Sequence, residues 1–238
     1  MLAWLPESVS TYSSTIDRMF VIILIITGVL FVLTETLLFL FAFMYRRRAG
    51  RRASHTHGNN TLEVVWTVIP AVLLVFLALA SRNAWNAIKG SVPETDEVIT
   101  VTASQFNWEM RYRGADGRFD TPDDVVTNNE MRVPVGKPIR VRLRSKDVIH
   151  SFFLPQLRLK QDAVPGLTIE VWFEATRTGE FEIACAELCG FGHYSMRGIL
   201  MVLEPSEYEA WIADAEAGIA AARGGEPADA PLDGEEAT

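Results

Sequence analysis

Cysteine, histidine and methionine side chains gather in one short stretch of the chain, CAELCGFGHYSM, which runs from Cys185 to Met196. It contains both cysteines of the 238-residue chain, one of the four histidines (His193), and a methionine three residues after that histidine. Thiolate and thioether ligands combined with imidazole favour copper, and a His–Cys–Met set is typical of copper sites that transfer electrons. The spacing therefore predicts a metal-binding loop.

A disulfide between Cys185 and Cys189 is the alternative. A bridge that closes so short a loop restricts the unfolded chain only slightly, so it would stabilise the fold little. The copper interpretation needs a distant histidine, and His150 in DVIHSFFLP is available, although a lone histidine is usually structural. Zinc would leave Met196 without a role. Copper uses all of these side chains, and we favour it.

Two apolar segments precede this region, at residues 19–45 and 62–80. Each contains one ionisable residue, Glu35 in the first and Glu63 near the start of the second. A helix that crosses a bilayer needs about 20 mostly apolar residues, and both segments meet that length. Neither shows the polar stripe of a helix on the surface of a soluble core. The sequence predicts a transmembrane hairpin with helices at about 19–45 and 62–85.

The loop between the two segments, residues 46–60, is basic. Short basic loops remain in the cytoplasm, which predicts a two-pass protein of the bacterial cytoplasmic membrane with both termini on the outer, periplasmic side. The first segment is too long for the core of a signal peptide, and we expect an uncleaved anchor. The arginines of this loop are Arg46, Arg47, Arg48, Arg51 and Arg52.

The region after the hairpin has the pattern of an all-β domain. Short runs rich in valine and isoleucine alternate with polar residues, and Gly, Pro and Asp turns separate them. This pattern predicts a Greek-key sandwich or barrel over residues 91–205. The predicted strands are residues 98–104, 109–113, 131–135, 139–145, 169–175, 180–186 and 198–204.

Residues 206–238 should form a short helix and a disordered acidic tail. Ser206 is the expected N-cap, with Glu209 completing a capping box. The predicted organisation is therefore a hairpin (1–90), a β domain (91–205) and a C-terminal segment (206–238). Residues 91–238 carry 14 Lys and Arg against 26 Asp and Glu, a net charge of −12. Such a surface steers cationic partners and disfavours nucleic acid, although ordinary solubility explains it equally well.

The motif C-x-E-x-C-x₃-H-x₂-M, with DVxHS 35 residues upstream, resembles the dinuclear CuA site of subunit II of the haem–copper cytochrome c oxidases. Two further segments are similar to that family: LEVVWTVIP (62–70) to its second membrane helix, and HSFFLPQLRLKQDAVPG (150–166) to the region after its first copper histidine. The resemblance covers most of the chain. It implies that the β domain is cupredoxin-like.

The resemblance implies the following site. Two copper ions would be bridged by both cysteine sulfurs, each ion would take one histidine, and a weak axial methionine and a backbone carbonyl would complete the set. The carboxylate of Glu187 would reach a magnesium ion at the interface with subunit I, and Glu63 would lie at the mouth of a proton channel. The implied copper ligands are His150, Cys185, Glu187 (carbonyl), Cys189, His193 and Met196.

The implied activity is that of a proton-pumping cytochrome c oxidase. This subunit would take electrons from a c-type cytochrome and pass them to haem centres that lie only in subunit I, where oxygen is reduced to water. It would hold no catalytic residue, and its partners would be the other oxidase subunits and lipid. Two alternatives remain open, the CuA subunit of a nitric oxide reductase and an extracytoplasmic copper-delivery protein. Quinol oxidase subunits lack the copper ligands, and nitrous oxide reductase is a larger soluble protein.

QFNWEM departs from the family pattern Gln-Trp-Tyr-Trp, whose first tryptophan accepts the electron from cytochrome c. Phe106 replaces that residue, and Trp108 is retained. We expect electrons to enter at this pair. The acids of the following turn are predicted to steer a basic donor: Asp116, Asp120, Asp123 and Asp124.

Overall fold

The computed structural model describes residues 5–50, 52, 55, 57–90 and 92–224. These residues form two compact units. Ser14–Ser91 make up the first unit, and the second combines the residues up to Ser13 with those from Val92 onward. The predicted boundary at residue 90 took no account of the segment before the first helix, which the structure groups with the β domain.

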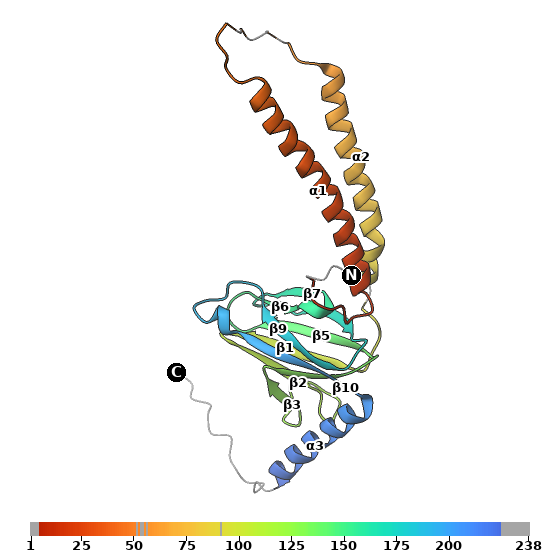
Figure 1. Ribbon diagram of the computed structural model, residues 1–238. Helices are drawn as coiled ribbons and strands as arrows, with labels where there is room; N and C mark the ends of the chain where they lie inside the picture. Colours follow the sequence, from red (N-terminus) through yellow and green to blue (C-terminus); the bar gives the residue numbers. More distant parts are fainter. Residues whose placement is uncertain (1–4, 51, 53–54, 56, 91, 225–238) are drawn as a thin grey trace. The chain divides into compact units, whose positions relative to one another are not determined.

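The helical unit is a hairpin of two long helices, α1 (Ser13–Met44) and α2 (Asn60–Trp85), and α2 continues into a π-helical turn, η1 (Asn86–Gly90) (Figure 1). The side-chain oxygen of Asn59 caps α2 by accepting hydrogen bonds from the backbone N–H groups of Thr61 and Leu62. Both spans are long and apolar enough to cross a membrane, and the protein buries neither of them.

The β unit is a sandwich of two five-stranded sheets with strand orders β3-β2-β1-β5-β8 and β4-β10-β9-β6-β7 (Figure 1). β1 runs parallel to β5 and β4 runs parallel to β10, whereas the other neighbours are antiparallel. The strands are β1 (Val98–Ser104), β2 (Asn107–Tyr112), β3 (Val125–Asn128), β4 (Glu130–Pro134), β5 (Pro138–Ser145), β6 (His150–Leu154), β7 (Leu159–Ala163), β8 (Ile169–Glu174), β9 (Gly179–Cys185) and β10 (Arg197–Leu203).

Seven of these strands were predicted within two residues, and β3, β6 and β7 were not. β6 is buried at four of its five positions, so it lacks the alternation that identifies a half-buried strand. β7 contains three polar residues in its five. The inward-facing side chains of the predicted strands do alternate, and all of those from β1 and β2 are buried in the core: Ile99, Val101, Ala103, Trp108, Met110 and Tyr112.

The C-terminal helix α3 begins at Pro205 and ends at Gly224, so the prediction that Ser206 is its N-cap is wrong. Proline suits the first helical position because it has no N–H to leave unpaired. The backbone N–H of Glu204 donates to the carboxylate of Glu207 at 3.2 Å, which supplies half of a capping box two residues earlier than expected. The predicted disordered tail lies outside the described residues.

The segment from residue 5 to Ser13, called the N-terminal segment below, pairs with the β unit. Ser10 forms a β-bridge with Ala175, and the backbone N–H of Val9 donates to the carbonyl of Gln156 at 3.0 Å. The hydroxyl of Tyr12 donates to the carbonyl of Trp172 at 3.1 Å. Val9 is only 1% exposed. The β unit is therefore completed by residues that precede the membrane helices.

We expect Val9→Ala to lower the stability of the β unit by about 1–2 kcal/mol, because it removes two buried methyl groups and leaves a small cavity. Thermal unfolding of the full chain, followed by circular dichroism in detergent, measures the loss. Val126→Ala is the matched control, because Val126 is 42% exposed on β3 and should change stability by less than about 0.5 kcal/mol. Equal effects of the two substitutions would show that the segment does not contribute to the core.

Candidate copper site

Three loops meet at one end of the sandwich: residues 105–106 between β1 and β2, residues 146–149 between β5 and β6, and residues 186–196 between β9 and β10. The sheet register explains their convergence, since Cys185 at the end of β9 lies close to the start of β6, where it pairs with Phe152. β6 begins at His150, so that histidine reaches the same end. The predicted ligands, 35 residues apart in sequence, are thus adjacent.

Around Cys185 the structure gathers one imidazole nitrogen and one carbonyl oxygen. The Cys185 Sγ lies 3.9 Å from His150 Nδ1 and 3.2 Å from the backbone oxygen of Glu187. The Sγ of Cys189 is 3.8 Å away on the other side. Cys185 therefore has a nitrogen, an oxygen and a second sulfur around it.

Around Cys189 the structure gathers a second imidazole nitrogen and the thioether. The Cys189 Sγ lies 3.6 Å from His193 Nδ1 and 3.8 Å from Met196 Sδ. A short 3₁₀ helix, η3 (His193–Ser195), brings this histidine and methionine round to the same sulfur. All six predicted ligands are thus in one cluster, arranged as two halves with one cysteine in each.

The two thiols are free rather than bridged. Their sulfur atoms are 3.8 Å apart, whereas a disulfide requires about 2.05 Å. The ligand atoms of His150, Cys185 and Cys189 all lie within 4.8 Å of one another, which is close enough to share a metal. Two sulfurs, two imidazole nitrogens and a thioether form a soft donor set that fits copper.

The cluster is largely enclosed. His150 is 0% exposed, and Cys189 and Met196 are 3% and 1% exposed. Burial, together with the neighbouring Cys185, raises the pKa of the Cys189 thiol to about 11. Without a cation this thiol remains protonated at neutral pH, so a bound metal must supply the positive charge that favours the thiolate.

Asp147 orients the His150 ring. The ring Nε2 donates to Asp147 Oδ1 at 2.9 Å, which leaves Nδ1 free to face Cys185. Burial pushes the pKa of Asp147 upward, but hydrogen bonds from His150, Gln105 and Val148 outweigh that effect and hold the pKa below its usual value. Asp147 is therefore an ionised acceptor at neutral pH. The sequence analysis missed it, although an acid three residues before a ligand histidine is a usable signal.

Trp108 supports the same histidine from the core. Its ring centroid lies 6.1 Å from that of His150 and 5.4 Å from that of Phe152, both in edge-on arrangements. Trp108 is 0% exposed, so it has no surface for a docking protein to contact. Its buried position fits a packing role, and electron entry through Trp108 stays a prediction.

Phe106 is exposed, as electron entry at this residue requires. It belongs to the turn between β1 and β2, and its ring packs against the loop that holds the cysteines. A Cβ atom added to Gly192 would come within 2.4 Å of the Phe106 ring, so ring and loop are in close contact. Three large side chains of that loop are almost fully exposed, and we call them the apolar rim: Leu188, Phe191 and Tyr194, at 78%, 94% and 79%.

Two acids of the turn after β2, Asp120 and Asp124, form ion pairs with arginines of the strands. Asp124 is 5% exposed and forms an ion pair with Arg111 at 3.3 Å. Asp120 lies 3.7 Å from Arg144 and 3.9 Å from Arg111. Asp123 accepts a hydrogen bond from the backbone N–H of Asp116 at 3.0 Å. These contacts hold the turn on the strands below it. Asp116 and Asp120 are exposed, so the steering of a basic donor by this turn stays a prediction.

The resemblance implies roles for two further acids, Glu187 and Glu63, which belong to different units of the chain. Glu187 is exposed on the loop between β9 and β10. Glu63 lies in the first turn of α2, within the helical unit, beside the cap residue Asn59.

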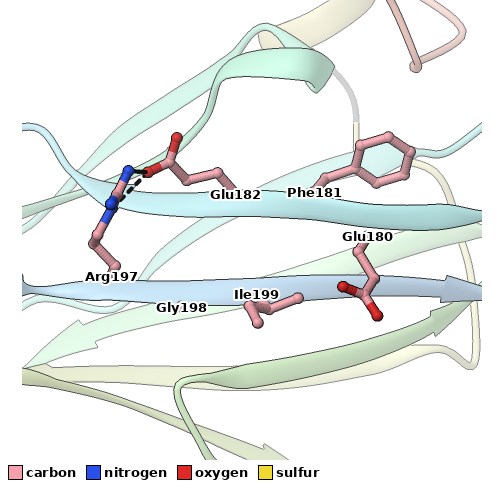
Figure 2. A pocket seen from close by; sticks show the side chains of 6 residues that line it. All are labelled: Glu180, Phe181, Glu182, Arg197, Gly198 and Ile199. Carbon is pink, nitrogen blue, oxygen red and sulfur yellow. Dashed lines mark hydrogen bonds and ion pairs between the residues drawn. The ribbon is translucent and has the colours of Figure 1, made fainter.

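A shallow pocket of about 370 Å³ opens on β9 and β10, lined by Glu180, Phe181, Glu182, Arg197, Gly198 and Ile199 (Figure 2). Figure 2 shows that Arg197 is already paired with Glu182, with Nε donating to Oε1 at 2.7 Å. The lining contains no thiol and no imidazole. It therefore offers no second site for a soft metal.

Comparison with known proteins gives two family matches. The model described as cytochrome c oxidase subunit II, periplasmic domain, matches residues 100–203. The model described as cytochrome c oxidase subunit II, transmembrane domain, matches residues 3–83. Together they cover both units of the chain.

Individual relatives agree with these matches. The chain is 31% identical to cytochrome c oxidase subunit 2 of Thermostichus vulcanus, over 87% of this chain and 77% of that one. It is 33% identical to alternative cytochrome c oxidase subunit 2 of Bradyrhizobium diazoefficiens, over 88% and 82%. The crystal structure of the periplasmic domain of subunit II of cytochrome oxidase from Bradyrhizobium japonicum aligns with 54% of this chain and 99% of that chain, at 34% identity and a TM-score of 0.48.

Proposed function

The chain belongs to the cytochrome c oxidase subunit II family, and on that premise we propose that it accepts electrons at a dinuclear copper centre and passes them to the haem centres of subunit I. The observation that carries this proposal is the paired arrangement of the ligands, in which each cysteine has its own histidine and one further donor. A single-copper site would need only one such half.

Copper held by His150, Cys185, the Glu187 carbonyl, Cys189, His193 and Met196 would supply one-electron redox chemistry. The residues of this chain supply the surroundings that such chemistry needs. Asp147 fixes the tautomer and orientation of His150, and Trp108 holds the ring from behind. Burial of Cys189 and Met196 excludes water. A ligand set held rigidly in this way changes little on oxidation and reduction, which keeps electron transfer fast.

The proposed partners contact the exposed parts of the copper loop. We place a c-type cytochrome donor over Phe106 and the apolar rim, because large exposed apolar side chains mark interaction surfaces. The exposed carboxylate of Glu187 would bind magnesium at the interface with subunit I, where a hard cation prefers oxygen ligands. Reduction of oxygen to water and proton pumping would take place in the assembled oxidase.

The chain is a two-pass membrane protein, since its two long apolar helices coincide with the transmembrane-domain match. The N-terminal segment belongs to the same unit as the β domain, which supports a hairpin whose two ends lie on the same side of the membrane. The arginine-rich loop at the other end of the hairpin favours the cytoplasm. We therefore propose that the copper site lies on the periplasmic side of a bacterial cytoplasmic membrane.

The experiment that tests this function is rapid mixing of the purified oxidase complex with a reduced c-type cytochrome. The copper absorption should bleach first, and reduction of the haems should follow at the rate at which the copper recovers. Reduction of the haems before any change in the copper absorption would contradict the proposed order.

Glu63→Gln should slow steady-state turnover and leave reduction of the copper centre by the donor unchanged, if Glu63 takes up protons for subunit I. Glutamine keeps the size of the side chain but cannot carry the charge. Stopped-flow spectroscopy separates the two rates in one preparation. Glu35→Gln is the control on the neighbouring helix. Equal slowing of both steps would indicate faulty assembly of the hairpin, and the proton role would be rejected.

A further inference from the structure

Gln105, in the turn between β1 and β2, makes hydrogen bonds to both ligand loops of the copper site. Its backbone N–H donates to Asp147 Oδ2 at 2.7 Å, and Asp147 is the partner of His150. Its side-chain Nε2 donates to the backbone carbonyl of Cys189 at 2.6 Å. A single residue thus connects the loop that orients one histidine to the loop that holds the buried thiol.

Phe106 adds a steric contact on the same side. A Cβ atom at Gly192 would lie 2.4–2.7 Å from three atoms of the Phe106 ring. The backbone of Gly192 (φ −88°) is one that any residue adopts, so the ring, and not the backbone conformation, leaves no room for a side chain there. The ring therefore lies directly against the chain between Cys189 and His193.

The base of the loop is held on the sheet, because the N–H of Ala186 donates to the carbonyl of Ser151 at 3.0 Å and the N–H of Cys185 donates to that of Met196 at 3.2 Å. Further along the loop, the backbone hydrogen bonds are short-range. The N–H of His193 donates to the carbonyl of Gly190 at 3.1 Å, and the N–H of Ser195 donates to that of Gly192 at 3.0 Å. Such bonds shape the loop locally but do not fix its distance from His150. Gln105 and Phe106 join the Cys189–His193 part of the loop to the turn between β1 and β2 and, through Asp147, to the loop that orients His150.

We propose that Gln105 and Phe106 form a positioning clamp that sets the separation of the two halves of the copper site. In this proposal, which rests on the proposed function, Gln105 determines how the Cys189–His193 half is held relative to the His150–Cys185 half. The Phe106 ring packs against the loop at Gly192 and so positions it, in addition to its proposed contact with the donor. Neither residue binds the metal.

The first test replaces Gln105 by leucine, which keeps the size of the side chain and removes its donor. In the metal-free full chain, the buried Cys189 should react faster with a thiol reagent, by about tenfold, because the carbonyl loses its partner and the loop opens more often. In the copper-loaded complex, the reduction potential and the copper hyperfine pattern should both shift. Asn107→Leu is the matched control, since the side-chain amide of Asn107, in the same hairpin, donates to Asn128 Oδ1 at 2.8 Å.

The second test is a compensating pair. Gly192→Ala should disturb the copper spectrum, because the new methyl group meets the Phe106 ring. Phe106→Ala in the same chain should restore the spectrum to that of Phe106→Ala alone, since the cavity accepts the methyl group. A native spectrum in Gly192→Ala, or no recovery in the double variant, would overturn the contact.

The two tests also separate the clamp from the function on which it rests. Absence of a shared-electron signal in the unsubstituted complex would contradict the dinuclear centre, whatever the variants do. A thiol reaction rate and a melting temperature in Gln105→Leu that equal those of the unsubstituted chain would contradict the clamp, because the measurement needs no metal.

Discussion

Serine in place of Cys185 or Cys189 is expected to abolish the shared-electron copper signal and to slow electron acceptance from the donor by more than about 100-fold. Loss of a residue that only supports a ligand typically costs 10–100-fold, and loss of a bridging ligand should exceed that range. The geometry gives the reason. Each sulfur lies within 4 Å of its own histidine and of the other sulfur. Removing either sulfur therefore removes the contact that joins the two halves of the cluster.

Met196→Leu provides the contrast. The thioether lies 3.8 Å from one sulfur only, at the edge of the cluster, and a weak axial ligand mainly tunes potential. This variant should keep the shared-electron signal with a shifted potential. Electron paramagnetic resonance of the three variants, prepared with copper under the same conditions, measures the difference. A serine variant that kept the dinuclear signal would contradict the bridging role of that cysteine.

Trp108→Ala is expected to destabilise the β unit by about 3–5 kcal/mol, the usual cost of removing a large aromatic side chain from a packed core. Trp108 is fully buried and its ring touches those of both Phe152 and His150. The cavity should also free the His150 ring, which would broaden the copper signal in the fraction that folds. Thermal unfolding and paramagnetic resonance of the same sample measure the two effects.

Trp108→Phe separates packing from electron acceptance. The indole Nε1 is buried without a hydrogen-bond partner among the described residues, so phenylalanine loses ring area and no hydrogen bond. Its stability should fall by much less than that of the alanine variant, and its bimolecular rate with the donor should equal that of the unsubstituted protein. A slower rate with unchanged stability would indicate that Trp108 takes part in electron transfer from the donor.

The cluster of proposed copper ligands could be predicted because cysteine and histidine are rare in this chain and because their spacing is one that a metal site requires. Two cysteines, a histidine and a methionine within one loop have few common uses, and His150 was the only remaining histidine outside the basic loop. The residues that position the ligands gave a weaker signal. Gln105 donates to a backbone carbonyl. Every residue type has such a carbonyl, so the contact cannot be recognised from the sequence.

The acidic turn makes contacts that the sequence pattern does not reveal. Four acids near a predicted docking site favour an exposed, steering surface when charge alone is considered. In the fold, Asp124 and Asp120 are opposite arginines that β2 and β5 supply, and those pairings depend on strand register. The N-terminal segment escaped prediction for a similar reason, since the pairing of Ser10 with Ala175 joins residues far apart in sequence.

The measurement that tests the central claim most directly is the paramagnetic resonance spectrum of the oxidised full chain in its purified complex, together with its copper content. The account predicts two copper ions per chain and one unpaired electron whose hyperfine pattern shows equal coupling to both nuclei. One copper ion per chain at full loading, with hyperfine coupling to a single nucleus, would contradict it.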